Sequence, residues 1–503
     1  MKKVKTSAAP PRRAAASSGL LGVTALIGLA ACTMTAGRGD PVASAAADIT
    51  FSAPVQLASD PELPRGVWFS DGYGYVIDRR HEALRAYDAT PGTCIEISLE
   101  PETRLSDFYD FAIVRQDQSV VRLWTEDEPH QTQYQVKSEL PPACEGAGPD
   151  ATPISVFDHF AAYFTEHYVF FDLFDVDWSE RVKARRSEIA NDMSNAELFG
   201  ALTGMIRDVR DAHVELTGDV DGEGRKFDAN EGIVPSLIEN NARVQSGTQN
   251  PGDAGAFYEG YLDGNISGSI LKGMGFASQN KYLRYGMATE EIGYIAIFHV
   301  ARYAIGDDQS SGAQKAAIRQ EMGKAIAHFQ QQAARVVIVD LSLNFGGFDY
   351  VGREIASHFA TLPTTTYSKQ ALDTEALIPP TIYTLEPADT VFAGPVYLLT
   401  TNGTVSGGET LSLSLRALPQ VTHLGETTRG ALSDKLEKPL PNGWEVTLSN
   451  ELYLDHEGRR WEGEGIPPEI PLQVFEGTAD PLASHRDAVA KVVSFAEEQL
   501  AQD

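Results

Sequence analysis

The pattern of apolar and polar positions changes twice in the first half of the chain. Between residues 50 and 148, short alternating runs such as 73–77 and 119–124 are broken by Gly, Pro and Asp turns, which predicts a small N-terminal β domain. From about 151 to 217 the apolar residues recur at helical spacing, which predicts a helical subdomain. Two helix starts are marked by capping signals, Ser194 before Glu197 and Asp177 before Glu180.

The second half alternates two kinds of segment. Unbroken apolar runs predict buried strands at 292–297, 336–341 and 395–400, and helical patterns fall at about 312–332, from about 350, and after 409. Repeated β-then-α order predicts an α/β core over 291–490, with a largely parallel sheet and function at loops beyond the strand ends. We expect residues 491–503 to finish a C-terminal helix and the Gly- and Asn-rich range 218–290 to be a linker or reduced cap domain.

The first residues have the pattern of a targeting segment. Five cations precede an apolar run over 20–31, which is too short to span a bilayer comfortably. The run ends in Leu-Ala-Ala-Cys, which resembles a bacterial lipoprotein cleavage box. We therefore expect a signal peptide at 1–31, a lipid on Cys32 and a tether over 32–49, with a plain secretory signal as the alternative. Thr33 is not the aspartate of inner-membrane retention, which by the same resemblance favours a periplasmic protein anchored in the outer membrane.

Charge and cysteine content agree with this location. The chain has 41 Lys and Arg against 70 Asp and Glu, a formal charge of −29, which argues against a nucleic-acid partner. Removing the five cations of residues 1–31 leaves about −34 for the mature protein. Apart from Cys32, the cysteines are Cys94 and Cys144, which an exported protein can hold as a disulfide. Two free buried thiols are the alternative.

Metal-binding and cofactor-binding signals are missing from the sequence. It has no CxxC or HExxH pattern and no His/Cys cluster with zinc spacing. The acidic segment 219–224 begins like a calcium loop, but its twelfth position is Asn230 instead of a bidentate glutamate. We expect neither a metal nor a cofactor.

Two loops of the α/β core carry candidate chemistry. Ser406 follows a predicted strand and begins a predicted helix, where the helix dipole and free amides favour developing negative charge. Gly346 and Gly347 follow another buried strand and offer the bare backbone amides that an oxyanion site requires. Taken singly, Ser406 could be an ordinary N-cap and the glycines a tight turn.

Taken in order, these motifs resemble those of the C-terminal processing (tail-specific) serine peptidases, and more closely their tricorn-core-like branch. The resemblance covers about 151–490 and implies a crotonase/ClpP-like β-β-α core. It is carried by an ordered set of segments: 340–347 (DLSLNFGG), 404–409 (TVSGGE), 425–430 (GETTRG), 440–443 (LPNG) and 462–469 (EGEGIPPE).

The resemblance also implies the roles of individual residues. Ala431 follows Arg429-Gly430 where the serine–lysine branch has its lysine, so a dyad is not expected. In the tricorn-like pattern, Ser406 is the nucleophile, His213 the general base and Glu462 the residue that completes the relay. The oxyanion donors are Gly407 and either Gly346 or Gly347.

Three departures from the family pattern bear on the substrate. Ser342 stands where an arginine is common, Ala212 precedes the histidine where a small polar residue can occur, and 218–290 lacks the pattern of a peptide-binding PDZ module.

We expect a cell-envelope lipoprotein that is a serine endopeptidase acting on a peptide or protein substrate. The alternatives are an inactive peptide-binding scaffold and an acyl ester or thioester hydrolase on the same fold.

Overall fold

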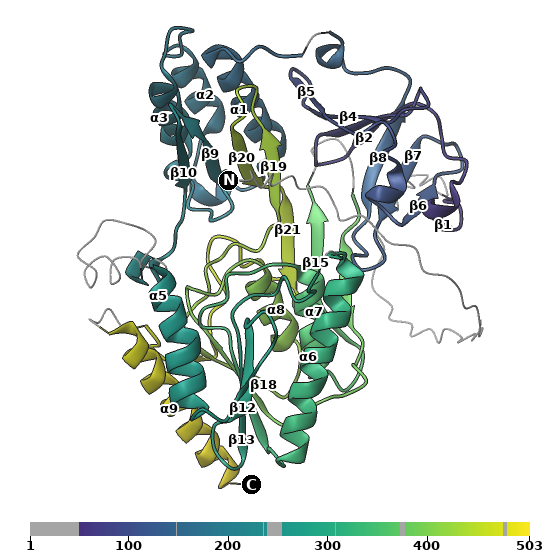
Figure 1. Cartoon of the computed structure of the whole chain (residues 1–503). Helices are drawn as coiled ribbons and strands as arrows, with labels where there is room; N and C mark the ends of the chain where they lie inside the picture. Colours follow the sequence, from purple (N-terminus) through teal and green to yellow (C-terminus); the bar gives the residue numbers. More distant parts are fainter. Residues whose placement is uncertain are drawn as a thin grey trace, which may run out of the picture.

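The computed structural model describes residues 50–146, 148–234, 236–238, 254–306, 308–372, 378–475 and 480–502. The expected signal peptide, the lipid site at Cys32 and the tether lie outside these residues. Figure 1 shows two units above an α/β core, the N-terminal β domain on the right and the helical subdomain on the left. No helix within the described ranges is both long enough and apolar enough to cross a membrane.

The N-terminal β domain is one antiparallel sheet in the order β1-β6-β7-β8-β2-β3-β4-β5. Its strands are β1 (Val55–Gln56), β2 (Val67–Ser70), β3 (Tyr75–Asp78), β4 (Arg85–Ala89), β5 (Cys94–Ile97), β6 (Phe111–Val114), β7 (Val120–Trp124) and β8 (Thr132–Lys137). Alternate residues such as Trp68, Leu123 and Tyr134 point into one buried core. Cys94 forms a disulfide with Cys144, which ties β5 to the 3-10 turn at Pro142–Cys144.

The helical subdomain packs three helices on a small sheet. The helices are α1 (Pro153–His167), α2 (Trp178–Arg186) and α3 (Asn195–Ile206). The Ser194 side chain accepts a hydrogen bond from the Glu197 amide, and the Asp177 side chain accepts one from the Glu180 amide. Both predicted helix starts are thereby confirmed. The sheet has the order β10-β9-β20-β19, with β9 (Glu215–Val220), β10 (Glu223–Asp228), β19 (Lys435–Pro439) and β20 (Glu445–Ser449). The C-terminal half of the chain therefore contributes two strands to this subdomain.

The core sheet has seven strands in the order β11-β12-β13-β14-β17-β18-β22, parallel from β13 onward. They are β11 (Phe276–Ala277), β12 (Leu283–Met287), β13 (Ile292–Ile297), β14 (Val336–Asp340), β17 (Val396–Thr400), β18 (Val421–Gly425) and β22 (Ile470–Pro471). All residues of β13, β14 and β17 are buried, as expected of strands covered on both faces. The predicted α/β class with a largely parallel sheet is confirmed.

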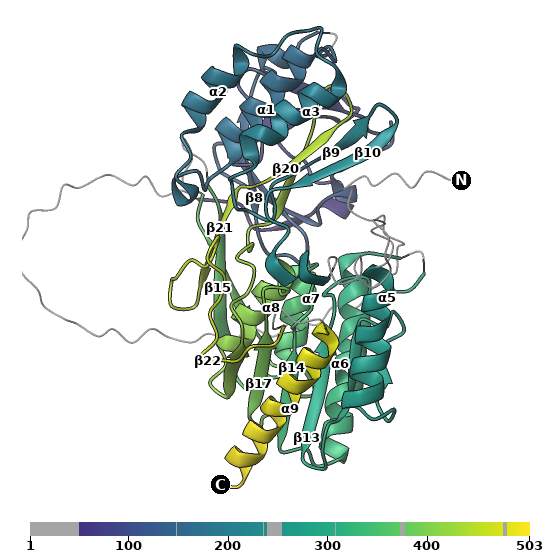
Figure 2. The same cartoon turned by 90° about the vertical axis from the view of Figure 1, so that its left-hand side faces the viewer.

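Helices cover both faces of this sheet, as Figures 1 and 2 show. On one face lie α5 (Ala254–Glu259), the π-helix Gly260–Ile270 that continues it, and α9 (Pro481–Leu500). On the other lie α6 (Ser311–Gln331), α7 (Asp349–Ser357) and α8 (Gly407–Arg416). The range 218–290, expected to be a linker or cap, thus holds a hairpin strand of the helical subdomain, the helical segment 254–270, and β11 and β12 of the core sheet.

A fourth sheet, which is small, lies between the upper units and the core (Figure 1). It consists of β16 (Thr381–Leu385), β15 (Thr364–Ala371) and β21 (Glu451–Asp455), all antiparallel. β21 follows β20 after one residue, so a nearly continuous stretch of chain runs from the helical subdomain down to the core. Remaining short 3-10 turns are at Leu57–Ser59, Leu105–Asp107 and Asp172–Phe174.

Candidate active site

Ser406 lies between β17 and α8 in a backbone conformation that is rare for a residue with a side chain. Its φ is 57° and its ψ is −125°, and it is the residue immediately before the first turn of α8. The preceding loop is fixed by buried threonines, since Thr401 Oγ1 donates to the Ser342 carbonyl (2.6 Å) and Thr404 Oγ1 to the Leu341 carbonyl (2.7 Å). Strain of this kind persists only where surrounding contacts enforce it. Ser406 is half-buried, at the start of a helix whose dipole favours negative charge.

Glu409, three residues further on, holds this conformation. It is fully buried and accepts four hydrogen bonds, from the amides of Ser406 (3.1 Å), Gly430 (2.7 Å) and Ala431 (2.8 Å) and from Thr428 Oγ1 (2.6 Å). Burial raises the pKa of this carboxyl, and the hydrogen bonds oppose the rise. We assigned Glu409 no role from the sequence. The capping-box spacing of Ser406 and Glu409 was the signal that could have found it.

The loop with Gly346 and Gly347 lies directly against the segment that carries Ser406. A Cβ placed on Gly346 would lie 2.8 Å from Ser406 Cβ and 3.1 Å from the Gly407 nitrogen, and the φ of Gly346 is 78°. The Gly346 amide donates to Asn344 Oδ1 (2.9 Å), so it is already engaged. Over the described residues, the amides of Gly347 and Gly407 donate no hydrogen bond. A Cβ placed on Gly407 would lie 2.8 Å from the Gly347 carbonyl oxygen, so these two residues are neighbours.

His213 lies in the turn between α3 and β9. Asp211 Oδ1 accepts from the His213 amide (2.8 Å), and Thr447 Oγ1 of β20 donates to the His213 carbonyl (2.6 Å). The side chain is 3% exposed, and its Nδ1 is buried without a hydrogen-bond partner. Burial lowers the pKa of the imidazole below its usual value, and the negative charge of Asp211 partly opposes this. The ring is therefore neutral at pH 7.

Glu462 is held by the loop that Glu409 also binds. Its Oε2 accepts hydrogen bonds from the amides of Leu432 and Ser433, both at 2.9 Å. These two residues directly follow the two whose amides Glu409 binds. Its Oε1 is buried without a partner. Burial, and then the charge of Asp211, raise the pKa of this carboxyl well above its usual range.

The structure brings some of the predicted residues together and leaves others apart. Ser406, Gly346, Gly347 and Gly407 form one contiguous cluster. Within the part of the chain that is described, the side chains of Ser406, His213 and Glu462 make no hydrogen bonds with one another.

Asp211 lies close to two of these residues. It accepts a hydrogen bond from Tyr168 Oη (3.0 Å), and its charge shifts the pKa of both His213 and Glu462. We assigned Asp211 no role from the sequence, and only its place two residues before His213 could have suggested one.

Among the described residues, no group of three or more His, Cys, Asp or Glu side chains could hold a metal ion. The acidic segment 219–224 forms the turn between β9 and β10, in which Asp219 Oδ1 accepts from the Gly222 amide (2.8 Å).

The comparisons with known proteins define the class of the core. Residues 291–472 match the model of peptidase family S41. The class that this match defines for the core is that of serine-type peptidases. No curated protein matches the chain.

Solved structures are similar to this chain at low sequence identity. A peptidase candidate from Parabacteroides merdae ATCC 43184 is 21% identical, with a TM-score of 0.53 over 69% of this chain and 97% of that one. Mature CPAF is 11% identical, with a TM-score of 0.49 over 70% of this chain and 98% of that one. The tricorn protease is 14% identical, with a TM-score of 0.41 over 86% and 44% of the two chains.

Proposed function

We propose that this protein is an endopeptidase of the cell envelope that cleaves peptide bonds through Ser406, His213 and Glu462. One observation carries the proposal: Ser406 is held in a strained conformation at the N-terminus of α8, in one cluster with Gly347 and Gly407, whose amides have no acceptor among the described residues. Amides aimed at the position of a developing oxyanion are among the largest contributors to acyl-transfer catalysis. The donors in this proposal are Gly407 and Gly347, because the amide of Gly346 is occupied by Asn344.

His213 is suited to act as the general base because it is neutral at pH 7. It accepts the Ser406 Oγ proton as the Oγ–C bond forms, and the carbonyl oxygen becomes the oxyanion. It then gives that proton to the leaving amine as the C–N bond breaks. Water next attacks the acyl carbon while His213 takes its proton, and His213 returns this proton to Ser406 Oγ as the Oγ–C bond breaks and the acid leaves.

Two orphaned atoms favour the proposed relay with Glu462. His213 Nδ1 and Glu462 Oε1 are both buried without hydrogen-bond partners, which is costly. They are also the two atoms that a relay would join, and both residues are influenced by Asp211. We propose that they meet when a substrate occupies the site. Glu462 then orients the imidazole and offsets its positive charge.

The location forms part of the same proposal. An apolar run ending in Leu-Ala-Ala-Cys supports cleavage after residue 31 and lipid attachment at Cys32, with outer-membrane anchoring favoured by Thr33. The disulfide between Cys94 and Cys144 suits an oxidising compartment outside the cytoplasm.

The test is cleavage of an unfolded protein substrate by the purified mature protein, followed by mass spectrometry of the products. Ser406→Ala is expected to abolish cleavage, and His213→Ala to lower kcat by about 10³-fold or more. Ser414→Ala is the matched control, because this buried hydroxyl of α8 bonds only the Thr410 carbonyl (2.9 Å). Undiminished cleavage by Ser406→Ala would contradict the proposal, and a folded parent that cleaves nothing would favour the inactive scaffold.

A further inference from the structure

A cavity of about 730 Å³ lies between the N-terminal β domain and the end of α1. One wall is a face of the sheet, to which β8 contributes Gln133, Gln135 and Lys137 at every second position. The opposite wall includes Glu166 and His167 of α1. The volume is that of a typical small-ligand site. None of the residues of the candidate active site lines it.

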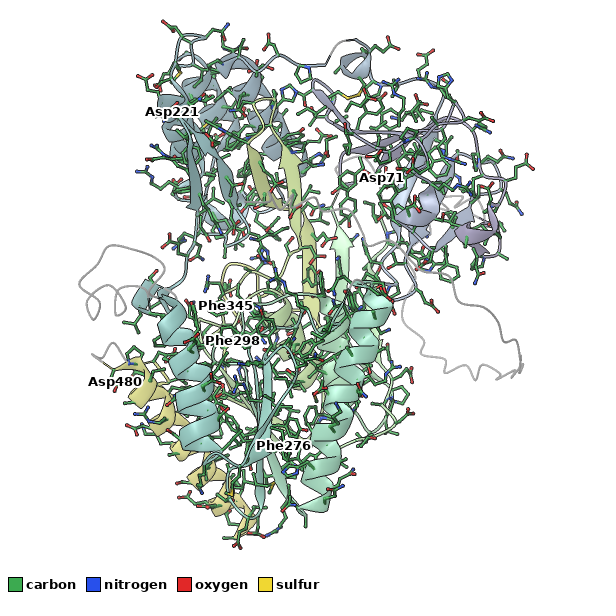
Figure 3. All side chains as sticks on the ribbon, viewed as in Figure 1. Asp71, Asp221, Phe276, Phe298, Phe345 and Asp480 are labelled. Carbon is green, nitrogen blue, oxygen red and sulfur yellow. A yellow bond between two sulfur atoms is a disulfide. The ribbon has the colours of Figure 1, made fainter. Side chains whose placement is uncertain are left out.

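The polar groups on the sheet wall are held in a fixed arrangement. Asp71 Oδ2 accepts from Gln133 Nε2 (2.7 Å) and Gln135 Nε2 (2.9 Å), and Gln133 Oε1 accepts from Arg122 Nε (2.8 Å). Figure 3 labels Asp71 on the side of the β domain that faces the helical subdomain. This network fixes the direction of the Arg122 side chain and leaves its two terminal nitrogens for another acceptor.

Two cations of the cavity lie against aromatic rings, and the charge of Asp71 also acts on one of them, Arg122. The Arg122 guanidinium lies 4.5 Å from the ring centroid of Phe51, and Lys137 Nζ lies 4.4 Å from that of Phe69. The ring contacts hold both cations in place. Lysine and arginine also outnumber acids in the lining, three to two, whereas acids outnumber them 70 to 41 in the whole chain.

His167 gives a second, independent indication of a ligand. Its side chain is 3% exposed, and neither ring nitrogen has a hydrogen-bond partner. A Cβ on Gly74 would lie 2.5 Å from His167 Nε2, so only glycine leaves room at this wall. Burial lowers the pKa of the ring, so the neutral imidazole offers one donor and one acceptor. An unsatisfied buried group of this kind is costly unless something binds it.

We propose that this cavity binds a peptide segment that carries Asp or Glu side chains. A carboxylate is received by the terminal nitrogens of Arg122, whose fork matches it in a bidentate manner, and by Lys137. His167 bonds the peptide backbone. The cavity is thus an exosite that selects acidic substrate segments at a distance from Ser406. The inference rests on the proposed function only in taking a peptide as the ligand.

The test uses the full mature protein carrying Ser406→Ala, so that binding is measured without cleavage. The probes are a fluorescent, terminally blocked octapeptide with alternating Ala and Glu and the same peptide with Gln for Glu, and binding is followed by anisotropy. The double variant Arg122→Gln/Lys137→Gln removes both cations. The matched control Lys183→Gln/Lys491→Gln makes the same change in net charge at exposed positions of α2 and α9.

We expect the Glu peptide to bind the parent, the Gln peptide to bind at least tenfold more weakly, and the double variant to lose at least tenfold in affinity for the Glu peptide. The control should stay within twofold. Hydrogen exchange on the parent should show peptide-dependent protection in β7 and β8. Equal binding of the two peptides, unchanged affinity in the double variant, or full displacement by equimolar succinate would overturn the proposal. Labelling of Ser406 by a fluorophosphonate in the otherwise unmutated protein reports separately on the proposed catalysis.

Discussion

The loop that carries Ser406 and the contact between the N-terminal β domain and the rest of the molecule are both built from buried polar groups. The groups that they join are separated by very different lengths of chain. Glu409 binds an amide three residues away and others about twenty residues away. In the domain contact, Tyr73 donates to Glu451 across 378 residues, Lys438 pairs with Asp88 across 350 and Arg353 with Glu128 across 225. The first arrangement is encoded locally and the second is assembled only by folding.

Because of this difference, we expect mutations in the two regions to affect different properties, catalysis in the loop and stability in the domain contact. The loop holds a strained Ser406 next to Gly346, so small displacements there act on chemistry. In the domain contact, buried charges are paired with one another, so the loss of one partner leaves a charge uncompensated. We therefore expect mutations in the loop to lower kcat with little effect on stability, and mutations in the contact to do the reverse.

The largest stability effect is expected from Lys438→Met. Lys438 Nζ is fully buried and donates hydrogen bonds to Asp88 and to the Tyr73 carbonyl (2.6 Å). The variant therefore leaves the Asp88 carboxylate buried without its cationic partner. Breaking such a pair costs about 3–5 kcal/mol. Denaturant unfolding should show this loss, and Lys438→Met/Asp88→Leu should recover most of it. If the single variant were as stable as the parent, the contact would not depend on this pair.

Gly346→Ala should have the opposite signature. The added Cβ meets Ser406 Cβ at 2.8 Å and forces a φ of 78° on alanine, so the proposed nucleophile is displaced from the proposed oxyanion donors. We expect kcat to fall by about 10²–10³-fold, the range seen when one oxyanion donor is lost. Gly323→Ala in α6, where an added Cβ meets nothing within 4 Å, is the control. A Gly346→Ala enzyme of normal kcat would mean that Ser406 tolerates displacement.

The smallest effect is a pH dependence of stability that originates in the domain contact. Burial raises the pKa of Glu451 to about 7, with Lys369 opposing and Asp434 adding to the rise. Because the folded form binds this proton more tightly than the unfolded form, its contribution is complete below about pH 4.5 and is lost as pH rises to about 7. The free energy of unfolding should fall by about 1–3 kcal/mol over that window. Glu451→Gln should flatten the dependence of the unfolding free energy on pH. An unchanged slope in this variant would mean that another group causes the pH dependence.

The same contrast explains what could be predicted from the sequence. Strands β13, β14 and β17 were predicted to within one residue at either end, because strands buried on both faces have unbroken apolar runs. Ser406, Gly346 and Gly347 could be singled out as candidates because their segments are short motifs next to such strands, and the structure places them in one cluster. The pairing of β9 with β20 was not predicted, because it joins residues more than 200 positions apart and neither segment indicates its partner. The partners of Glu128 and Lys438 were missed for the same reason.

The most direct test of the central claim is the rate at which a fluorophosphonate modifies the purified mature protein, followed by intact mass and peptide mapping between pH 5 and 9. The account predicts a single adduct on Ser406. Because burial lowers the pKa of His213 below its usual value, the labelling rate should rise with pH to a plateau, with a midpoint on the acid side of that of an ordinary imidazole. His213→Ala should remove both the plateau and most of the rate. A folded protein that forms no adduct, or forms it on another residue, would contradict the assignment of Ser406 as an activated nucleophile.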